Sequence, residues 1–266
     1  MLSRTAIPEN LLAEAAERLL LAEATKTPCA PVRDLIGTDD LHAAYAVQQR
    51  IVDSRVAQGS VVVGRKIGLT SPAVQEQFGV DRPDFGRLFG HMAYIGGDTV
   101  PLGSILQPRV EAEIAFVLAK DLDAGDCDVD QVRQAVDYAV AAIEICGSRI
   151  AHWDISFGDT VADNASTGAF VLGPRRMTLS EFEPRDVEMS MSIDGMEVST
   201  GNGAACLGNP LNAVAWLARQ ARDLGDPLRA GEVVLSGALG PMHSVTASGQ
   251  VTARISTLGN VTVEFR

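Results

Sequence analysis

The chain has 266 residues, of which 46% are hydrophobic, and its formal net charge is −12 at pH 7. This composition supports a packed core, and the negative charge disfavours nucleic acid or an anionic membrane as the main partner, since both need a basic surface. The cysteines, Cys29, Cys127, Cys146 and Cys206, form no C-x-x-C pair, so neither a zinc ribbon nor a disulfide framework is predicted. With no basic leader and no membrane-length apolar segment, the expected location is the cytoplasm.

Two helices are predicted before residue 60. Apolar residues recur at helical spacing from Pro8 to about Thr25, with acidic residues in the first turns. A second helix is expected from Asp40 to about Ala57, because a Thr-Asp-Asp capping cluster precedes it. We therefore expect residues 1–60 to form a small helical region, attached to a larger domain that spans residues 61–266.

The middle of the chain alternates strand patterns with polar segments. A buried strand is predicted over residues 61–70, and Ser71-Pro72 favours the start of a short helix. Pro83-Asp84-Phe85-Gly86 is typical of a turn followed by an irregular stretch. Further expectations are a strand at 109–118, a helix from about 130 to 138, a strand around Glu144 and an irregular segment at 148–167.

The C-terminal part is richer in strands. The alternating run 189–198 contains Asp194-Gly195, which favours a two-residue hairpin turn, and Asn209-Pro210 predicts the start of a helix that runs to about Leu224. Other strands are expected at 168–173, 232–237, 243–256 and 260–266. Because strands occur in consecutive runs, the sequence predicts an α+β fold with a mixed β core and peripheral helices.

Three glutamates stand inside apolar strand patterns. Successive side chains of a strand point to opposite faces, so Glu111 and Glu113 share one face of the predicted strand at 109–118. Glu144 stands alone in a second apolar run. Clustered carboxylates repel one another unless one is protonated or a cation lies between them, and Mg²⁺ and Mn²⁺ prefer such ligands. The alternative is that one of these glutamates faces solvent and has no function.

Other polar residues are weaker candidates for a site. Lys66 ends a buried strand pattern between two glycines, where it is either a surface lysine or a charge directed at a ligand. Asp84, Asn164 and Ser166 are equally compatible with turns. The loop at 236–240, Ser-Gly-Ala-Leu-Gly, follows a strand and would expose backbone N–H groups that suit an anion.

Several common chemistries lack their sequence signatures. The glycine-rich segment at 201–206 lacks the last glycine of a dinucleotide fingerprint, and the chain contains no P-loop. There is also no G-x-S-x-G elbow, and the four histidines show no metal-ligand spacing. Nucleotide binding is therefore disfavoured, and a Ser-His hydrolase would require distant residues to converge.

Six separated segments resemble, in order, the fumarylacetoacetate hydrolase superfamily, and within it the 2-hydroxypenta-2,4-dienoate hydratases and 4-oxalocrotonate decarboxylases. The resemblance extends from about residue 30 to the C-terminus. The segments are GRKIGLT at 64–70, PDFG at 83–86, QPRVEAE at 107–113, EICGSRI at 144–150, ADNAS at 162–166 and SGALGP at 236–241.

The resemblance implies a mixed β-roll catalytic domain and a Mg²⁺ or Mn²⁺ ion held by Glu111, Glu113 and Glu144. It further implies a pocket containing a catalytic lysine, aspartate and serine together with substrate-binding residues. No histidine here matches the His-Glu pair of the C–C hydrolases, which disfavours hydrolysis. The implied catalytic residues are Lys66, Asp84 and Ser166, and the implied substrate-binding residues are Leu69, Asn164, Ser236 and Gly237.

The expected reaction is hydration of 2-hydroxypenta-2,4-dienoate to 4-hydroxy-2-oxopentanoate in the catabolism of aromatic compounds. Decarboxylation of 2-oxohex-4-enedioate, hydration of a longer 2-hydroxydienoate and a non-catalytic relative are the alternatives. Arg65, Arg109 and Arg149 could each serve the second carboxylate that a decarboxylase substrate carries. The resemblance also implies a homo-oligomer, and an association with the next pathway enzyme, an aldolase, is a further expectation.

Overall fold

The computed structural model describes residues 7–71, 75–76 and 80–266 of the chain. Most of the short helix predicted from Ser71-Pro72 lies outside these described residues. Among the described helices, none has both the length and the apolarity that crossing a bilayer requires.

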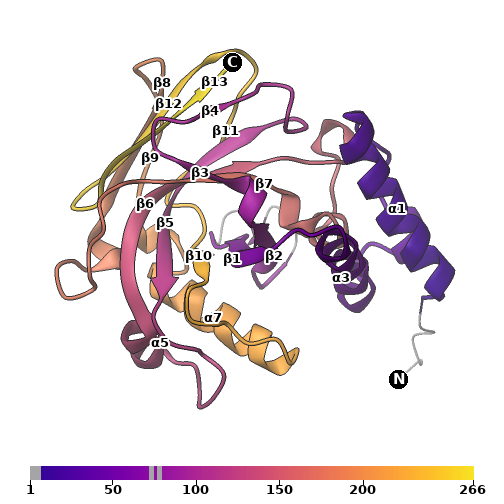
Figure 1. Ribbon diagram of the computed structural model, residues 1–266, viewed down its shortest axis with the longest axis horizontal. Coiled ribbons are helices and arrows are strands. Elements are labelled where there is room, and N and C mark those ends of the chain that lie inside the picture. Colours follow the sequence, from indigo (N-terminus) through magenta and orange to yellow (C-terminus); the bar gives the residue numbers. More distant parts are fainter. Residues whose placement is uncertain (1–6, 72–74, 77–79) are drawn as a thin grey trace.

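Three helices come first in the chain. They are α1 (Glu9–Thr25), α2 (Arg33–Ile36) and α3 (Leu41–Ala57), so both predicted N-terminal helices are confirmed. The Asp40 side chain caps α3 by accepting a hydrogen bond of 3.0 Å from the Ala43 N–H. Helices α1 and α3 share a separate apolar cluster with α6 (Phe157–Ala162), and Figure 1 shows α1 and α3 at one end of the molecule. The domain boundary near residue 60 stays a prediction.

The larger sheet contains eight strands within the described residues. Its strand order is β2-β1-β10-β5-β6-β7-β3, with β11 pairing beside β5. Most neighbours are antiparallel, whereas β1 pairs with β10 in parallel and β3 pairs with β7 in parallel. The strands are β1 (Val62–Gly68), β2 (Asp84–Phe89), β3 (Ala93–Ile95), β5 (Arg109–Leu118), β6 (Val136–Cys146), β7 (Thr167–Leu172), β10 (Val233–Leu235) and β11 (His243–Ser244).

A second sheet of five strands, again counted over the described residues, packs against β5 and β6. Its order is β4-β13-β12-β8-β9, and the predicted hairpin is confirmed because Asp194 and Gly195, both with positive φ, join β8 to β9. Helices α5 (Val129–Ala135) and α7 (Pro210–Asp223) contact each other beside the larger sheet (Figure 1). The strands are β4 (Thr99–Val100), β8 (Glu188–Ile193), β9 (Met196–Asn202), β12 (Gly249–Ile255) and β13 (Gly259–Phe265). The predicted α+β fold is confirmed.

Four local predictions were wrong. The strand expected at 243–256 is two strands, because β11 pairs with β5 in the larger sheet and β12 belongs to the second sheet. The segment at 83–86 is not a turn, because Asp84 begins the fully buried strand β2, which pairs with β1. The helix expected to reach residue 138 ends at Ala135, and β6 begins at the next residue. The segment at 148–167 is not irregular throughout, since it contains the buried helix α6, capped by Ser156.

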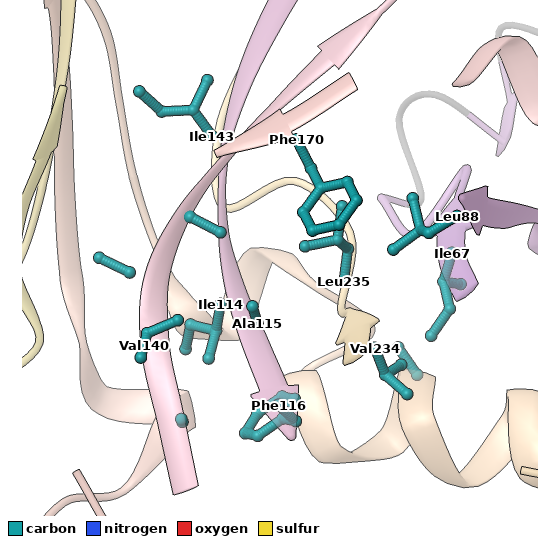
Figure 2. Packing of buried hydrophobic residues seen from close by; sticks show 14 of the residues in the cluster. Ile67, Leu88, Ile114, Ala115, Phe116, Val140, Ile143, Phe170, Val234 and Leu235 are labelled. Carbon is teal, nitrogen blue, oxygen red and sulfur yellow. The ribbon is translucent and has the colours of Figure 1, made fainter. Parts of the chain in front are cut away.

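The main apolar core lies around β5, β6, β7 and β10. Figure 2 shows part of it, with Ile114 and Phe116 from β5, Val140 and Ile143 from β6, and Phe170 from β7. Val110, Ala112 and Ile114 are buried on one face of β5, so the residues that alternate with them project from the other face. Packing in this core therefore fixes the positions of β5 and β6, the two strands that carry the predicted glutamates.

Candidate active site

The register of β5 and β6 brings the three glutamates to one face of the sheet. Glu111 lies directly opposite Glu144, and Glu113 lies opposite Ala142, one side-chain step further along. Glu113 and Glu144 are fully buried, and Phe170 of β7 is the neighbour of Glu144 on the other side. We call Glu111, Glu113 and Glu144 the acid face.

The acid face has too few partners for its charge. Within the described residues, both oxygens of Glu144 and one oxygen of Glu113 are buried without a hydrogen bond. Burial, followed by repulsion from Glu144, raises the pKa of Glu111 to about 7. Burial, Glu144 and Glu111 raise the pKa of Glu113 well above its ordinary value. Buried polar groups are normally paired, so this cluster suits an added cation.

Lys66 and Asp84 come from the neighbouring strands β1 and β2. Lys66 pairs with Gly86 and Asp84 pairs with Gly68, so each charged residue lies opposite a glycine. A Cβ on Gly68 would lie 2.2 Å from Asp84 Oδ1 and 3.4 Å from Lys66 Nζ, which shows that both side chains fill the space a larger residue would need. Gly68 therefore makes room for this pair of charges, whereas a Cβ on Gly86 would collide with the Asn164 carbonyl.

Lys66 connects this pair to the acid face. Its Nζ lies 3.1 Å from Glu144 Oε1, in an ion pair that falls outside hydrogen-bond geometry. Burial lowers the pKa of Lys66, but Glu144 and the other nearby anions outweigh it and raise that pKa above its ordinary value. Burial raises the pKa of Asp84, and Lys66 lowers it. These neighbours favour the charged ammonium form of Lys66, which offsets part of the charge of the acid face.

The loop at 236–240 contacts the acid face through its backbone. The Gly237 N–H donates a hydrogen bond of 2.8 Å to Glu113 Oε2, so one N–H of the predicted anion-binding loop holds a carboxylate of the protein itself. Gly237 has a φ of 103°, and a Cβ there would collide with Thr70. The buried Ser236 hydroxyl donates to the Gly237 carbonyl at 3.2 Å.

Asn164 and Ser166 belong to a left-handed turn behind β2. Residues 164–166 have backbone φ values of 53°, 51° and 53°, which residues other than glycine rarely adopt. The Asn164 amide donates to the Arg87 carbonyl at 2.9 Å and accepts from the Arg87 N–H at 2.8 Å, so it fixes β2 in place. Ser166 Oγ lies 3.1 Å from Thr160 Oγ1. The roles predicted for Asn164, Ser166, Ser236 and Leu69, which has a φ of 56°, stay predictions.

Cys146 is a neighbour of the acid face that the sequence did not single out. It lies two residues after Glu144 on the same face of β6, and its Sγ is 3.9 Å from Glu111 Oε2. Oxygen atoms of Glu111 and Glu144 and this sulfur all lie within 4.8 Å of one another. Its position two residues after Glu144 in a predicted strand was the sequence signal that could have identified Cys146 as a neighbour of the acid face.

Two of the three arginines considered for a second substrate anion are already paired within the protein. Arg149 binds Asp163, and Arg65 binds the Asp226 carbonyl at 2.7 Å and lies 3.2 Å from the Asp226 carboxylate. Arg109 is different, because its guanidinium stacks over the Trp153 ring at 4.2 Å and Nη1 lies 3.5 Å from Met242 Sδ.

Comparison with models of known protein families agrees with the resemblance seen in the six sequence segments. The model of the fumarylacetoacetate (FAA) hydrolase C-terminal family matches residues 65–266, which include the acid face, Lys66 and Asp84. The chain belongs to this family. The resemblance predicted from the six segments is thereby confirmed.

Three relatives of this family member are especially similar. The chain is 54% identical over 257 residues to the 2-keto-4-pentenoate hydratase of Burkholderia vietnamiensis, which covers 97% of this chain and 98% of that one. It is 53% identical over 248 residues to the TodF product hydratase of Pseudomonas putida, covering 92% of each. One solved structure is also similar, that of 4-oxalocrotonate decarboxylase from Pseudomonas putida G7 complexed with magnesium and adipate. Its TM-score is 0.94 at 32% sequence identity, and the match covers 99% of this chain and 100% of that one.

Proposed function

We propose that this protein is a metal-dependent hydratase that adds water to 2-hydroxypenta-2,4-dienoate, the enol tautomer of 2-keto-4-pentenoate, to give 4-hydroxy-2-oxopentanoate. The observation that carries this proposal is the 54% identity to a 2-keto-4-pentenoate hydratase over 97% of this chain. The site supports it, because buried carboxylates and a buried lysine lie next to one another.

The acid face fits a hard divalent ion. Its unpaired, buried carboxylate oxygens are the donors that Mg²⁺ and Mn²⁺ prefer, and the relative with a TM-score of 0.94 was crystallised with magnesium. Glu111, Glu113 and Glu144 would hold the ion. When bound, the ion would supply Lewis acidity toward the carboxylate and 2-oxygen of the substrate.

The remaining steps are proton transfers by this chain's own side chains. The substrate's 2-hydroxyl would lose its proton to solvent, and a proton would be added at C5, which makes C4 electrophilic. Water then adds at C4, and a proton is delivered to C3. Lys66, which its neighbouring anions keep protonated, is the proposed proton donor, and Asp84, beside it, is the proposed acceptor of a proton from the water. Ser166, Leu69, Asn164, Ser236 and Gly237 complete the proposed pocket.

A decarboxylase of 2-oxohex-4-enedioate is the second candidate, favoured by the TM-score of 0.94 to 4-oxalocrotonate decarboxylase. That substrate carries a second carboxylate, which needs a cation of its own. Arg65 and Arg149 are both paired within the protein, so Arg109, which stacks on Trp153, is the one of the three arginines left to bind that carboxylate. Hydration of a longer 2-hydroxydienoate would use the same acid face and differ only in the distal half of the pocket.

The test offers both substrates to the protein after chelator treatment, with and without Mg²⁺ or Mn²⁺. We expect no turnover without metal, recovery with either ion, and faster formation of 4-hydroxy-2-oxopentanoate than of CO₂. Glu144→Gln should not recover, whereas the exposed control Glu188→Gln should. Faster CO₂ release from the diacid would favour the decarboxylase, and full activity of metal-free Glu144→Gln would exclude the metal role. A protein inactive under every condition would be a non-catalytic relative.

Three further features of the proposal concern the cellular context. We expect a homo-oligomer in the cytoplasm and an association with the aldolase that acts on the product. Light scattering of the purified protein, and co-purification with that aldolase, would test these expectations.

A further inference from the structure

We propose that Cys146 gives the site a second way of holding a divalent ion, through the set Glu111, Glu144 and Cys146. This sulfur-containing set would take ions that accept thiolate ligands, such as Zn²⁺, Cd²⁺ or Co²⁺. The inference rests on the proposed function in so far as both ligand sets use Glu111 and Glu144.

The register of β5 and β6 creates two overlapping groups of ligands. Glu111 and Glu144 form the central pair, with Glu113 diagonally on one side and Cys146 diagonally on the other. Ligand atoms of Glu111, Glu144 and Cys146 lie within 4.8 Å of one another, whereas Glu113 is not part of that close group. One oxygen of Glu113 is instead held by the Gly237 N–H at 2.8 Å. The protein in this conformation therefore places the thiol nearer the central pair than the third carboxylate.

Cys146 also differs from the other buried cysteines in its surroundings. The Cys206 thiol donates to the Ser236 carbonyl at 3.0 Å, and the Cys127 thiol contacts the Leu122 carbonyl at 3.9 Å. Among the described residues, the polar contact of the Cys146 thiol is with the Glu111 carboxylate. Both oxygens of the adjacent Glu144 are buried without a hydrogen bond in the described part of the chain, and its Oε1 forms an ion pair with Lys66, so the Glu144 carboxylate keeps oxygen lone pairs for a ligand.

The size of the group is compatible with a bound ion after a small movement. Tetrahedral zinc with bonds of about 2.0 Å to oxygen and about 2.3 Å to sulfur separates its ligand atoms by about 3.5 Å. The three ligand atoms here lie within 4.8 Å, so rotations of the side chains that move each atom by about 1 Å would suffice. No change of strand register is needed.

The nature of the ion decides which set is used. A hard ion such as Mg²⁺ prefers three carboxylates and leaves the thiol protonated, whereas a thiophilic ion displaces the thiol proton to solvent and bonds to the sulfur. This exchange releases one proton per ion and involves no oxidation. Because both sets share Glu111 and Glu144, thiophilic ions should compete with Mg²⁺ for the site.

The experiment titrates chelator-treated protein with Cd²⁺ or Co²⁺ and records the ultraviolet thiolate-to-metal charge-transfer absorption. We expect a band that saturates near one ion per chain, is suppressed by excess Mg²⁺, and disappears in Cys146→Ser. The matched control Cys206→Ser should keep the band, since the Cys206 thiol donates to the Ser236 carbonyl and is not among the close ligand atoms of Glu111, Glu144 and Cys146. Cd²⁺ affinity should fall by at least about tenfold in Cys146→Ser.

Loss of the band in Cys206→Ser as well as Cys146→Ser, its persistence in Cys146→Ser, or its absence from the unmodified protein would overturn the inference. Circular dichroism establishes that each variant is folded, and Cys146→Ala replaces Cys146→Ser if the latter is not. Hydration with Mg²⁺ is measured separately on the unmodified protein. A band without hydration would refute only the proposed function, and hydration without a band would refute only this inference.

Discussion

Two buried clusters of charged residues in this molecule differ in how completely their polar atoms are hydrogen-bonded. The acid face places Glu113 and Glu144 in a fully buried position with oxygens that lack hydrogen bonds in the described structure. The second cluster, which we call the Arg149 clamp, consists of Arg149, Asp163 and Thr167. Its guanidinium donates to the Asp163 carboxylate and backbone carbonyl, and to the Thr167 carbonyl at 2.7 Å.

The difference leads us to expect that the Arg149 clamp maintains the fold and that the acid face is the proposed ligand site. The Arg149 clamp satisfies its own charges and joins both ends of the left-handed turn at 164–166, whose Asn164 fixes β2. The acid face leaves charge uncompensated, which costs stability unless something else supplies a cation. A buried ion pair with complete hydrogen bonding is therefore a structural element here, and incomplete bonding marks the functional site.

Arg149→Met should produce the largest loss of stability. It leaves the Asp163 carboxylate buried without its cation, and breaking a buried pair from one side typically costs about 3–5 kcal/mol. Burial already raises the pKa of Asp163 to about 6 against the opposing effect of Arg149. Without Arg149 the buried aspartate favours its neutral form further, so the variant should lose stability, relative to the original protein, as pH rises above about 6, the folded-state pKa of Asp163 in the original protein.

Urea denaturation at pH 5.5 and 7.5 measures this difference. The double variant Arg149→Met/Asp163→Asn should recover part of the stability, because the unpaired charge is gone. A single variant as stable as the original protein at pH 7.5 would show that the Arg149 clamp does not support the fold.

Glu113→Gln should have the opposite signature. We expect Mg²⁺ affinity to fall by more than roughly 100-fold. Loss of a residue that only supports a metal ligand already lowers metal affinity by up to about 100-fold, and Glu113 is proposed to be a ligand itself. The stability of the metal-free protein should stay the same or rise, because the amide oxygen can still accept the Gly237 N–H and the repulsion on the acid face decreases. Calorimetric Mg²⁺ titration and thermal unfolding measure the two quantities. A large loss of stability with unchanged affinity would remove the distinction between the two clusters.

Local patterns were sufficient for much of the fold. Helices α1, α3 and α7, strand β5 and the β8–β9 hairpin follow from periodicity, caps and the Asp194-Gly195 turn. Strand β2 was missed because Pro, Asp and Gly at 83–86 are common turn residues. Its strand conformation depends on pairing with β1 and on the contact between Gly86 and the turn at 164–166. Such long-range pairing is not encoded in the local pattern.

The candidate site was only partly accessible from the sequence. Alternation alone placed Glu111 and Glu113 on one face, but the position of Glu144 opposite Glu111 depends on the register of two strands. The proximity of Lys66 to Glu144 likewise results from the order of the strands in the sheet. Family resemblance supplied these links. It said nothing of Cys146, whose position only the register reveals.

The pH dependence of metal binding provides a third, smaller effect. Burial and Glu144 raise the pKa of Glu111 from 4.5 to about 7, so below that pH a binding ion must displace a proton. Mg²⁺ affinity should fall by about tenfold per pH unit below 7 for each proton displaced. The same shift means that the metal-free protein loses stability as pH rises from 4.5 toward 7, because the folded state holds the proton more tightly. Affinity that is constant between pH 6 and 8 would contradict this expectation.

The smallest effect concerns Ser166, which belongs to the turn whose two ends the Arg149 clamp joins. Its hydroxyl is buried and lies 3.1 Å from Thr160 Oγ1. Thr160→Val and Ser166→Ala both break this hydrogen bond with little change of shape, so each should cost about 1 kcal/mol of stability. The two variants differ in what they leave behind, because only Thr160→Val keeps the serine hydroxyl. If Ser166 contacts the substrate as predicted, kcat should fall by at least about tenfold in Ser166→Ala and change little in Thr160→Val. Equal kcat values in the two variants, with equal losses of stability, would assign Ser166 to the structural cluster and limit the reacting groups to Lys66 and Asp84.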